Sequence, residues 1–228
     1  MKRMLWAMAL FVFVFAPPLR AQMGMDLFKR PSLTKFFHPV VGKGAEYQTV
    51  TATGSNTRTR TRTMQMGIVG KESVDGKDGY WMEFVSNGEG SSMIGKSLMT
   101  VDDFQFHRII FMMPGKGAME MPITPDAAQK NRVQESLQDW HSVGSETITV
   151  PAGTFSCDHY KNDKTGGEIW TSDKITPYGL VKEQSKDHSM ILVKVLDTFP
   201  DQITGPVQKF DPQALMQQMQ QQRQHPTQ

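Results

Sequence analysis

The stretch RTRTRTMQMGIVGKESVDGKDGYWMEFV, residues 58–85, predicts two strands joined by a tight turn. Over residues 58–69 the side chains largely alternate, and Thr, Val and Ile, which favour an extended backbone, are frequent. Asp75-Gly76 is a residue pair typical of a two-residue hairpin, and Tyr80 to Val85 is the returning strand. Strands joined by so short a turn are antiparallel, so this part of the chain is predicted to be a β-hairpin.

Strand-like segments continue on both sides of this hairpin. Residues 46–53 precede it, and Phe104 to Met113 is the most apolar candidate strand after it, so we expect that strand in the centre of the sheet. Five further segments follow, at 146–150, 154–161, 168–172, 180–184 and 190–198. The turns between several of them are short and contain Gly or Pro. Because a parallel pair needs a long crossover, these short turns predict an antiparallel meander.

One amphipathic helix near 125–140 is expected to interrupt the strands. Thr124 is suited to cap its first turn, and Pro125 is suited to the first helical position. Val133, Leu137 and Trp140 recur on one face, which we expect to cover apolar surface on the sheet. The prediction is therefore a mainly β (α+β) domain over 44–205, a curved antiparallel sheet or half-barrel with one covering helix.

The two ends of the chain differ from this domain. Residues 1–21 have the features of a cleavable signal peptide, with a basic start and an uncharged apolar run from Met4 to Phe15 that is too short to span a membrane. Cleavage after Ala21 would leave a soluble periplasmic or extracellular protein without a transmembrane anchor. Residues 22–43 are expected to form an irregular lead-in, and the Gln-rich residues 206–228 a flexible tail.

Charge and cysteine content narrow the functional classes. Three of the 25 basic residues lie in the first 21 positions, so 22 basic residues face 23 acidic ones after cleavage. A near-neutral chain gives no general reason to bind nucleic acid, and no such partner is expected. Cys157 is the single cysteine, so no intramolecular disulfide can form. Its position on a predicted strand, beside Phe155, favours a buried side chain.

The motifs that suggest catalysis lack the surroundings they need. Residues 90–97, GSSMIGKS, match the phosphate-loop pattern, but that pattern requires a preceding parallel strand and a following helix. The residues after Ser97 predict another strand, so we expect a Gly/Ser hairpin loop. The six histidines are scattered without metal-ligand spacing, and there is no G-x-S-x-G motif. We therefore expect no enzymatic activity, no cofactor and no metal.

Several short stretches resemble a group of exported bacterial proteins of unknown function. They are Pro39 to Tyr47, Val150 to Cys157, Glu168 to Trp170 and Pro177 to Lys182. These proteins are similar in layout to the periplasmic lipoprotein carriers LolA and LolB, whose antiparallel sheet curls into a half-barrel around a helical plug and binds acyl chains. The resemblance implies the fold more firmly than the function, and it transfers no ligand-contacting residue.

The leading functional hypothesis is an exported, non-enzymatic protein that binds a lipid-like or other apolar ligand. Its pocket would be lined by apolar residues of the central strand and by two tryptophans: Phe104, Phe106, Ile110, Met112, Trp140 and Trp170. Arg58, Arg60 and Arg62 alternate with threonines and share one face of their strand. These arginines either face solvent and protect a sheet edge, or contact an anionic group such as a lipid headgroup.

Two alternatives belong to other classes. One is a structural or interaction module of the cell envelope, which engages a partner protein through its sheet edges and the Gln-rich residues 213–228. The other is copper handling by Met112, Met113 and Met119 with His107, because thioethers bind Cu(I). Methionines also pack adaptably in apolar surroundings, and the absence of a tight His/Met repeat favours that interpretation.

Overall fold

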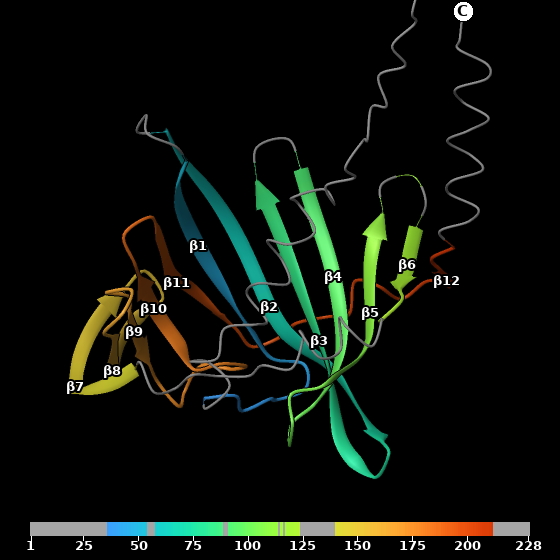
Figure 1. The fold of residues 1–228 in the computed structure, drawn as a ribbon, viewed down its shortest axis with the longest axis horizontal. Coiled ribbons are helices and arrows are strands. Elements are labelled where there is room, and N and C mark those ends of the chain that lie inside the picture. Colours follow the sequence, from blue (N-terminus) through green and yellow to red (C-terminus); the bar gives the residue numbers. More distant parts are fainter. Residues whose placement is uncertain are drawn as a thin grey trace, which may run out of the picture.

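The computed structural model describes residues 36–53, 58–88, 91–113, 115, 117–123 and 140–211. Within these ranges twelve strands form one open sheet, in the order β12-β6-β5-β4-β3-β2-β1-β11-β10-β9-β8-β7 (Figure 1). Neighbouring strands are antiparallel except for β12, which runs parallel to β6. No helix in the described part of the chain has the length and hydrophobicity needed to cross a membrane.

Most of the strands overlap predicted segments, but residues 91–97, expected to form a Gly/Ser hairpin loop, belong to a strand, and the strands at 117–121 and 207–209 were not predicted. The first half of the chain forms β1 (Gly44–Thr53), β2 (Arg58–Val74), β3 (Lys77–Gly88), β4 (Ser91–Thr100), β5 (Phe106–Met113) and β6 (Gly117–Met121). The second half forms β7 (Trp140–Val150), β8 (Gly153–Asn162), β9 (Glu168–Thr171), β10 (Leu180–Gln184), β11 (His188–Leu196) and β12 (Val207–Lys209).

The predicted hairpin is confirmed as the pair β2 and β3. Val74 is opposite Lys77, which leaves Asp75 and Gly76 as a two-residue turn. Both turn residues have positive φ, 50° and 79°, as the mirror-image turns of hairpins require. Asp and Gly adopt this backbone more readily than other residues, so the turn chemistry read from the sequence accounts for the observed geometry.

The predicted meander is confirmed in the second half of the chain. Strands β7 to β10 each pair with the next strand in antiparallel register, and β10 pairs with β11. Strand β11 then pairs with β1, which joins the two halves of the chain into one sheet. In Figure 1 the β7 to β10 part turns away from the broad β1 to β6 part, so the sheet is strongly curved.

Three expectations need correction or fall outside the described residues. Strand β5 is the third strand from one edge, whereas β1 and β2 occupy the centre, because the meander adds its strands beyond β1 rather than beyond β6. Trp140, expected at the end of a helix, is the first residue of β7. The rest of the predicted helix, 124–139, lies outside the described residues. The segment 206–211, expected in the tail, contains β12.

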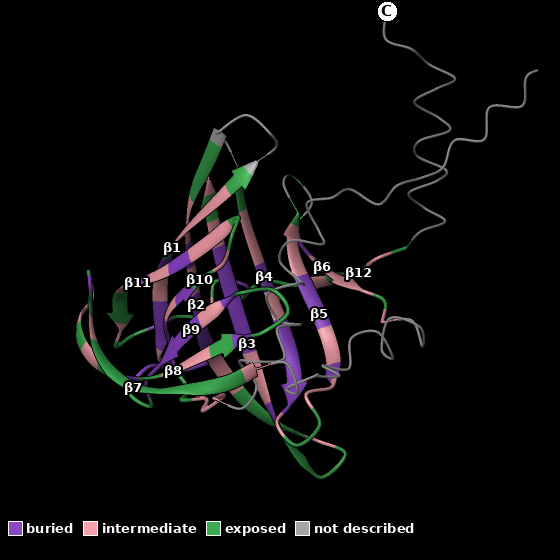
Figure 2. Ribbon diagram, turned by 60° about the vertical axis from the view of Figure 1, so that its left-hand side comes forward, coloured by how far each residue is buried: buried purple, intermediate pink, exposed green. Residues whose placement is uncertain are grey.

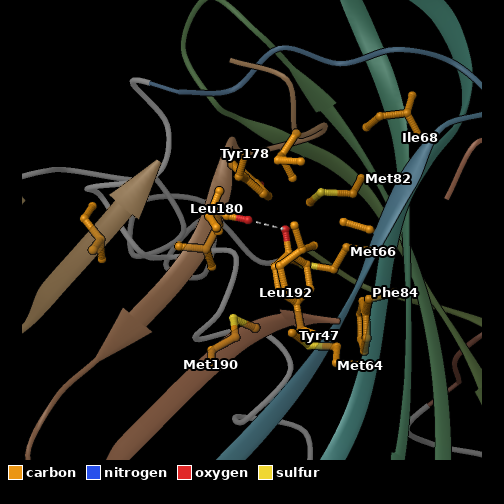
Figure 3. Close-up of a cluster of buried hydrophobic side chains, with 14 of the residues drawn as sticks. Tyr47, Met64, Met66, Ile68, Met82, Phe84, Tyr178, Leu180, Met190 and Leu192 are labelled. Carbon is orange, nitrogen blue, oxygen red and sulfur yellow. Dashed lines mark hydrogen bonds between the residues drawn. The ribbon is translucent and has the colours of Figure 1, made fainter. Parts of the chain in front are cut away.

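The two faces of the sheet carry separate hydrophobic clusters. We call the face with Tyr47, Met66 and Met82 the inner face, and the opposite one the outer face. The inner cluster also contains Leu180 and Met190, so strands from both halves of the chain pack against each other across the curve (Figures 2 and 3). The smaller outer cluster is formed by buried Ile110, Ala118 and Ile203.

The segment after β11 crosses the outer face and ends as β12 beside β6 (Figure 1). We call residues 197–211 the strap. Phe199 is buried over Gly44 and Gly67, where a Cβ atom would lie 3.0 Å and 2.4 Å from its ring. The backbone N–H of Gln202 donates to both carboxylate oxygens of Glu83, at 3.0 and 3.2 Å. The strap therefore covers outer-face side chains that an open sheet would otherwise expose.

Candidate ligand-binding face

The inner face of β2 changes from cationic to apolar along the strand. Arg60 is opposite Thr51 and Arg62 is opposite Thr49 on β1. Because side chains two residues apart point to the same face, these arginines lie on the same side as Met64, Met66 and Ile68. The three apolar residues are buried, whereas Arg60 is exposed and Arg62 is half-buried. One face of a single strand thus has a polar end and an apolar end.

The apolar end is tightly packed around two tyrosines (Figure 3). Tyr47 is fully buried, and its hydroxyl donates to the backbone carbonyl of Leu180 at 3.1 Å. Burial raises the pKa of Tyr47 and of Tyr178 well above the usual value for tyrosine, because a phenolate cannot be solvated there. Both side chains are therefore neutral structural groups at physiological pH.

An aromatic closure connects the two halves of the curved sheet at the apolar end. The ring of Phe37 lies 5.0 Å from Tyr178, in the β9–β10 connection, and 5.8 Å from Phe104, in the β4–β5 connection. The neighbouring Phe36 lies 5.1 Å from Tyr160 on β8. These centroid distances are typical of attractive aromatic pairs. The described part of the predicted lead-in is thus anchored between the two walls of the sheet.

A strip of partly exposed apolar side chains continues the inner face over β4 to β6. Phe111 is opposite Gly95 and Met119, and Met121 is opposite Ile109. The strip consists of Met93, Phe111, Met119 and Met121, all half-buried. Gly95 makes room for an aromatic pair, since a Cβ there would lie 2.3 Å from the Phe84 ring and 2.9 Å from the Phe111 ring. We call these four residues the Met/Phe strip.

The six predicted pocket residues are divided between the two faces. Phe106 and Trp170 are buried in the inner cluster, and Phe104 and Trp140 pack against it. Ile110 is buried in the outer cluster and Met112 packs against that cluster. Simple alternation along 104–113 would place all four of these strand residues on one face. In the pairing of β4 with β5, however, Leu98 is opposite Arg108 while Met99 is opposite Phe106, so a register shift of one extra residue interrupts the alternation. Such a shift reverses which face later side chains occupy.

Trp170 is engaged by residues of neighbouring strands. Its ring stacks on His159, with centroids 4.3 Å apart, and the Lys182 ammonium lies 4.5 Å from its centroid. Its indole N–H donates to Glu146 at 2.5 Å, and the same carboxylate oxygen lies 3.1 Å from His159. These contacts favour a structural role for Trp170 in joining β7 to β10.

Both interpretations of the arginines are compatible with the structure. Pairing of β2 with β3 begins at Thr63 and Asn87, so around Arg60 only β1 pairs with this strand among the described residues. The side chain of Arg58 lies outside the described residues. Neither Arg60 nor Arg62 has a carboxylate within ion-pair distance among the described residues, whereas Arg108 on β5 is paired with Glu120 through two hydrogen bonds of 2.9 Å.

The copper and nucleotide interpretations do not fit the geometry. Met119 shares a face with Phe111, while Met112 packs in the outer cluster, so the proposed thioether ligands point to opposite sides of the sheet. The described residues contain no group of three or more His, Cys, Asp or Glu side chains placed to bind a metal ion. Lys96 lies within strand β4 and pairs with Asp201 of the strap. Cys157 is buried as expected, and burial raises the pKa of its thiol to about 11.

A polar cluster that sequence spacing did not indicate surrounds Thr100. Its hydroxyl oxygen lies 2.5 Å from Asp103 and 3.1 Å from Nε2 of His107. Partial burial opposes ionisation of Asp103, but hydrogen bonds from Lys77 and Thr100 lower its pKa to about 2. Thr100 is fully buried, so its hydroxyl is inaccessible to a substrate. The cluster therefore stabilises the β4–β5 connection.

Comparisons with known proteins give distant structural similarities only. No protein-family model and no curated protein sequence matches the chain. One similar solved structure is a protein from Bacteroides fragilis described as exported, with a YmcC-like fold; it has 11% identity and a TM-score of 0.37, and the match covers 70% of this chain and 98% of that one. A second, described as a lipoprotein from Parabacteroides distasonis, has 14% identity and a TM-score of 0.38, with 70% of this chain and 97% of that one covered. A third, a DUF1329 family protein from Desulfovibrio piger, has 11% identity and a TM-score of 0.28, with 81% of this chain and 94% of that one covered. None of the three is described as a LolA-type carrier, so that resemblance stays a prediction.

Proposed function

We propose that this chain is an exported, non-enzymatic binding protein that holds a lipid-like or other apolar ligand against the inner face of its sheet. Export is proposed from the predicted signal peptide, residues 1–21. The apolar ligand is proposed from the inner face over β4 to β6.

The Met/Phe strip is the observation that carries this proposal. Met93, Phe111, Met119 and Met121 form a group of half-buried apolar side chains on one side of three neighbouring strands. A contiguous apolar surface that stays partly open to solvent is a common feature of ligand and partner sites. Methionine is flexible and polarisable, so it adapts to acyl chains of different shapes.

The polar groups on the described strands support binding rather than catalysis. Arg108 is neutralised by Glu120, and Lys96 by Asp201, on the outer face. The Thr100 hydroxyl, which has both a histidine and a carboxylate nearby, is fully buried. These groups stabilise the sheet and its connections, and the inner strip offers a ligand apolar contact.

The proposal predicts that mature protein, residues 22–228, carries or takes up an acyl compound. Native mass spectrometry and lipid extraction of protein purified without detergent would detect it, and uptake of a fluorescent fatty acid would measure it. We expect Met119→Glu to reduce uptake about tenfold or more, because a charge beside the chain must be desolvated. Val143→Glu is a matched control, since Val143 is an exposed apolar residue on β7, 52% accessible.

Two results would count against the proposal. One is purified protein that neither carries an acyl compound nor takes up the fluorescent fatty acid. The other is equal uptake by Met119→Glu and Val143→Glu, which would place any bound acyl chain away from the strip. Far-UV circular dichroism of both variants verifies that the sheet is intact.

A second candidate, the envelope interaction module, is favoured by the edge strand β7. Seven consecutive residues, 141–147, are exposed on this strand, and among the described residues only β8 pairs with it. Such an edge can accept a strand from a partner protein. Crosslinking in cells with the full chain and with a chain lacking residues 213–228 tests this role. An unchanged set of crosslinked partners would argue against the part assigned to the tail.

A further inference from the structure

The cationic end of the inner face lies beside the Met/Phe strip. Arg62 is opposite Thr49 on β1, and the adjacent residue Thr63 is opposite Asn87 on β3, which places Gly88 next to Arg62. One row further along, Met64 is opposite Ser86, and Ser86 is opposite Met93. Because neighbouring strands are about 5 Å apart, Met93 lies about 10 Å across the sheet from β2.

Gly88 allows the Arg62 side chain to reach toward the strip. A Cβ atom at Gly88 would lie 2.9 Å from Cγ and 3.0 Å from Nε of Arg62. The arginine side chain therefore lies across β3 at the position where that strand lacks a side chain. This orientation directs the Arg62 guanidinium from β2 toward β4, the strand that carries Met93.

The charge at this end of the face is not neutralised by the described residues. Arg60 and Arg62 are on the same face, two residues apart, and repel each other. Neither has a carboxylate within 4.0 Å among the described residues. Glu183 is in the same cross-strand row as Arg62, but Met190 and Thr49 lie between them. Two polar contacts nearby involve no carboxylate: the Thr49 hydroxyl donates to the backbone carbonyl of Arg62 at 3.3 Å, and the Thr51 hydroxyl lies 3.3 Å from Nδ1 of His188.

We propose that Arg60 and Arg62 bind the phosphate head of an amphiphile whose hydrocarbon chain lies on the Met/Phe strip. This inference rests on the proposed function, because it names the ligand class for the same inner face. Guanidinium groups match phosphate oxygens in geometry and charge, and two of them oppose the two charges of a phosphate monoester. The residues between Arg62 and Met93 on this face, Gly88 and Ser86, are small enough for a chain to pass over.

Titration with three dodecyl amphiphiles below their micelle concentrations tests this proposal. Dodecyl phosphate has the proposed head, dodecyl maltoside is neutral and dodecyltrimethylammonium is cationic. Inorganic phosphate alone tests for a site that needs no chain. By isothermal calorimetry we expect dodecyl phosphate to bind about tenfold more tightly than dodecyl maltoside, with the cationic amphiphile weakest. Higher salt should reduce the preference, because exposed charges are screened.

The arginine variants separate the head contact from the chain contact. Arg60→Gln/Arg62→Gln is expected to lose the preference for dodecyl phosphate and to keep the wild-type affinity for dodecyl maltoside. Arg60→Lys/Arg62→Lys keeps the charge and should retain most of the preference. Lys71→Gln/Lys77→Gln is the matched control, since it removes two positive charges from the opposite end of the same hairpin and should change neither affinity.

Each contrary result has a distinct meaning. If wild-type protein binds dodecyl phosphate and dodecyl maltoside equally, or if the glutamine variant keeps the preference, the headgroup assignment is wrong while the proposed function stands. If inorganic phosphate binds as tightly as dodecyl phosphate, the site is a free-anion site and the amphiphile assignment is wrong. If no amphiphile binds, the proposed function itself fails.

Discussion

Glu83 is a carboxylic acid on β3 that is completely removed from solvent. Its burial raises its pKa to about 7, and contact with Asp201 acts in the same direction, while the N–H of Gln202 opposes both. Hydrogen bonds from Lys96 and Glu83 keep the pKa of Asp201 low against its own partial burial. Below about pH 7, Glu83 is therefore protonated while Asp201 carries a negative charge, which Lys96 balances.

Glu83→Gln tests this protonation state through the pH dependence of stability. A raised folded pKa contributes stability below the ordinary value of 4.5 and loses it as pH rises through about 7. We expect wild-type protein to lose about 2 to 3 kcal/mol of unfolding free energy between acidic and mildly alkaline pH, and Glu83→Gln to lose much less. Urea unfolding across this range measures it. Asp75→Asn, in the exposed hairpin turn, should behave as wild type, and parallel pH profiles for wild type and Glu83→Gln would contradict the assignment.

At the scale of elements, the strap is held by side-chain packing as well as by strand pairing. Phe199 fills the space left by Gly44 and Gly67, Ile203 is buried in the outer cluster, and three residues of β12 pair with β6. The outer face beneath it also holds Trp81, whose ring lies 5.1 Å from the Lys96 ammonium and 5.2 Å from the Arg108 guanidinium. The strap thus combines an apolar anchor with a charged one.

A double-mutant cycle between Phe199 and Gly67 tests the apolar anchor. Phe199→Ala should cost about 3 kcal/mol through the lost packing, and Gly67→Ala about 2 kcal/mol through its clash with the ring. The double variant should be less destabilised than the sum by about 1 kcal/mol, because the shortened side chain makes room for the new methyl group. Urea unfolding at one pH supplies all four values.

Gly70→Ala is the control for this cycle. A Cβ at Gly70 would lie 3.5 Å from Trp81, an ordinary contact, so its effect should add to that of Phe199→Ala. Additivity in the Gly67 cycle as well would mean that the ring and the glycine do not contact each other in solution.

At the scale of the whole molecule, the two faces of the sheet are shielded from solvent by different parts of the chain. The inner face is closed at its apolar end by the sheet's own curvature and by Phe37, and its Met/Phe strip stays partly open. The outer face over β3 to β6 is covered by the strap. In Figure 2 the buried residues run along the middle of β2 to β5, consistent with cover on both faces.

Truncation separates the contribution of the strap from that of the sequence beyond it. A chain ending at residue 211 keeps every described contact and should unfold at the wild-type temperature. A chain ending at residue 196 exposes Ile110 and Ala118, so we expect a lower midpoint and increased binding of an apolar dye. The strap would have no structural role if the two truncated chains gave the same midpoint and the same dye signal.

The hairpin at Asp75-Gly76 and the meander from β7 to β11 could be predicted because both depend on local chemistry. Turn residues and alternating side chains specify where strands begin, end and reverse. The buried state of Cys157 followed from the same alternation. For the site, the sequence predicted that the arginines share a face and that Phe104 and Phe106 belong to an apolar cluster, but not which faces these are.

Turn residues and alternating side chains identified most strand segments and the antiparallel meander, because these features depend on residues close together in the chain. They did not identify β4 or β6. The central place of β2, the location of Ile110 and Met112 on the face opposite Phe111, and the pairing of the strap with β6 became known from the three-dimensional arrangement. Register shifts and long-range contacts set these features. The bond between Gln202 and Glu83 joins residues 119 positions apart, a separation over which no local pattern carries information.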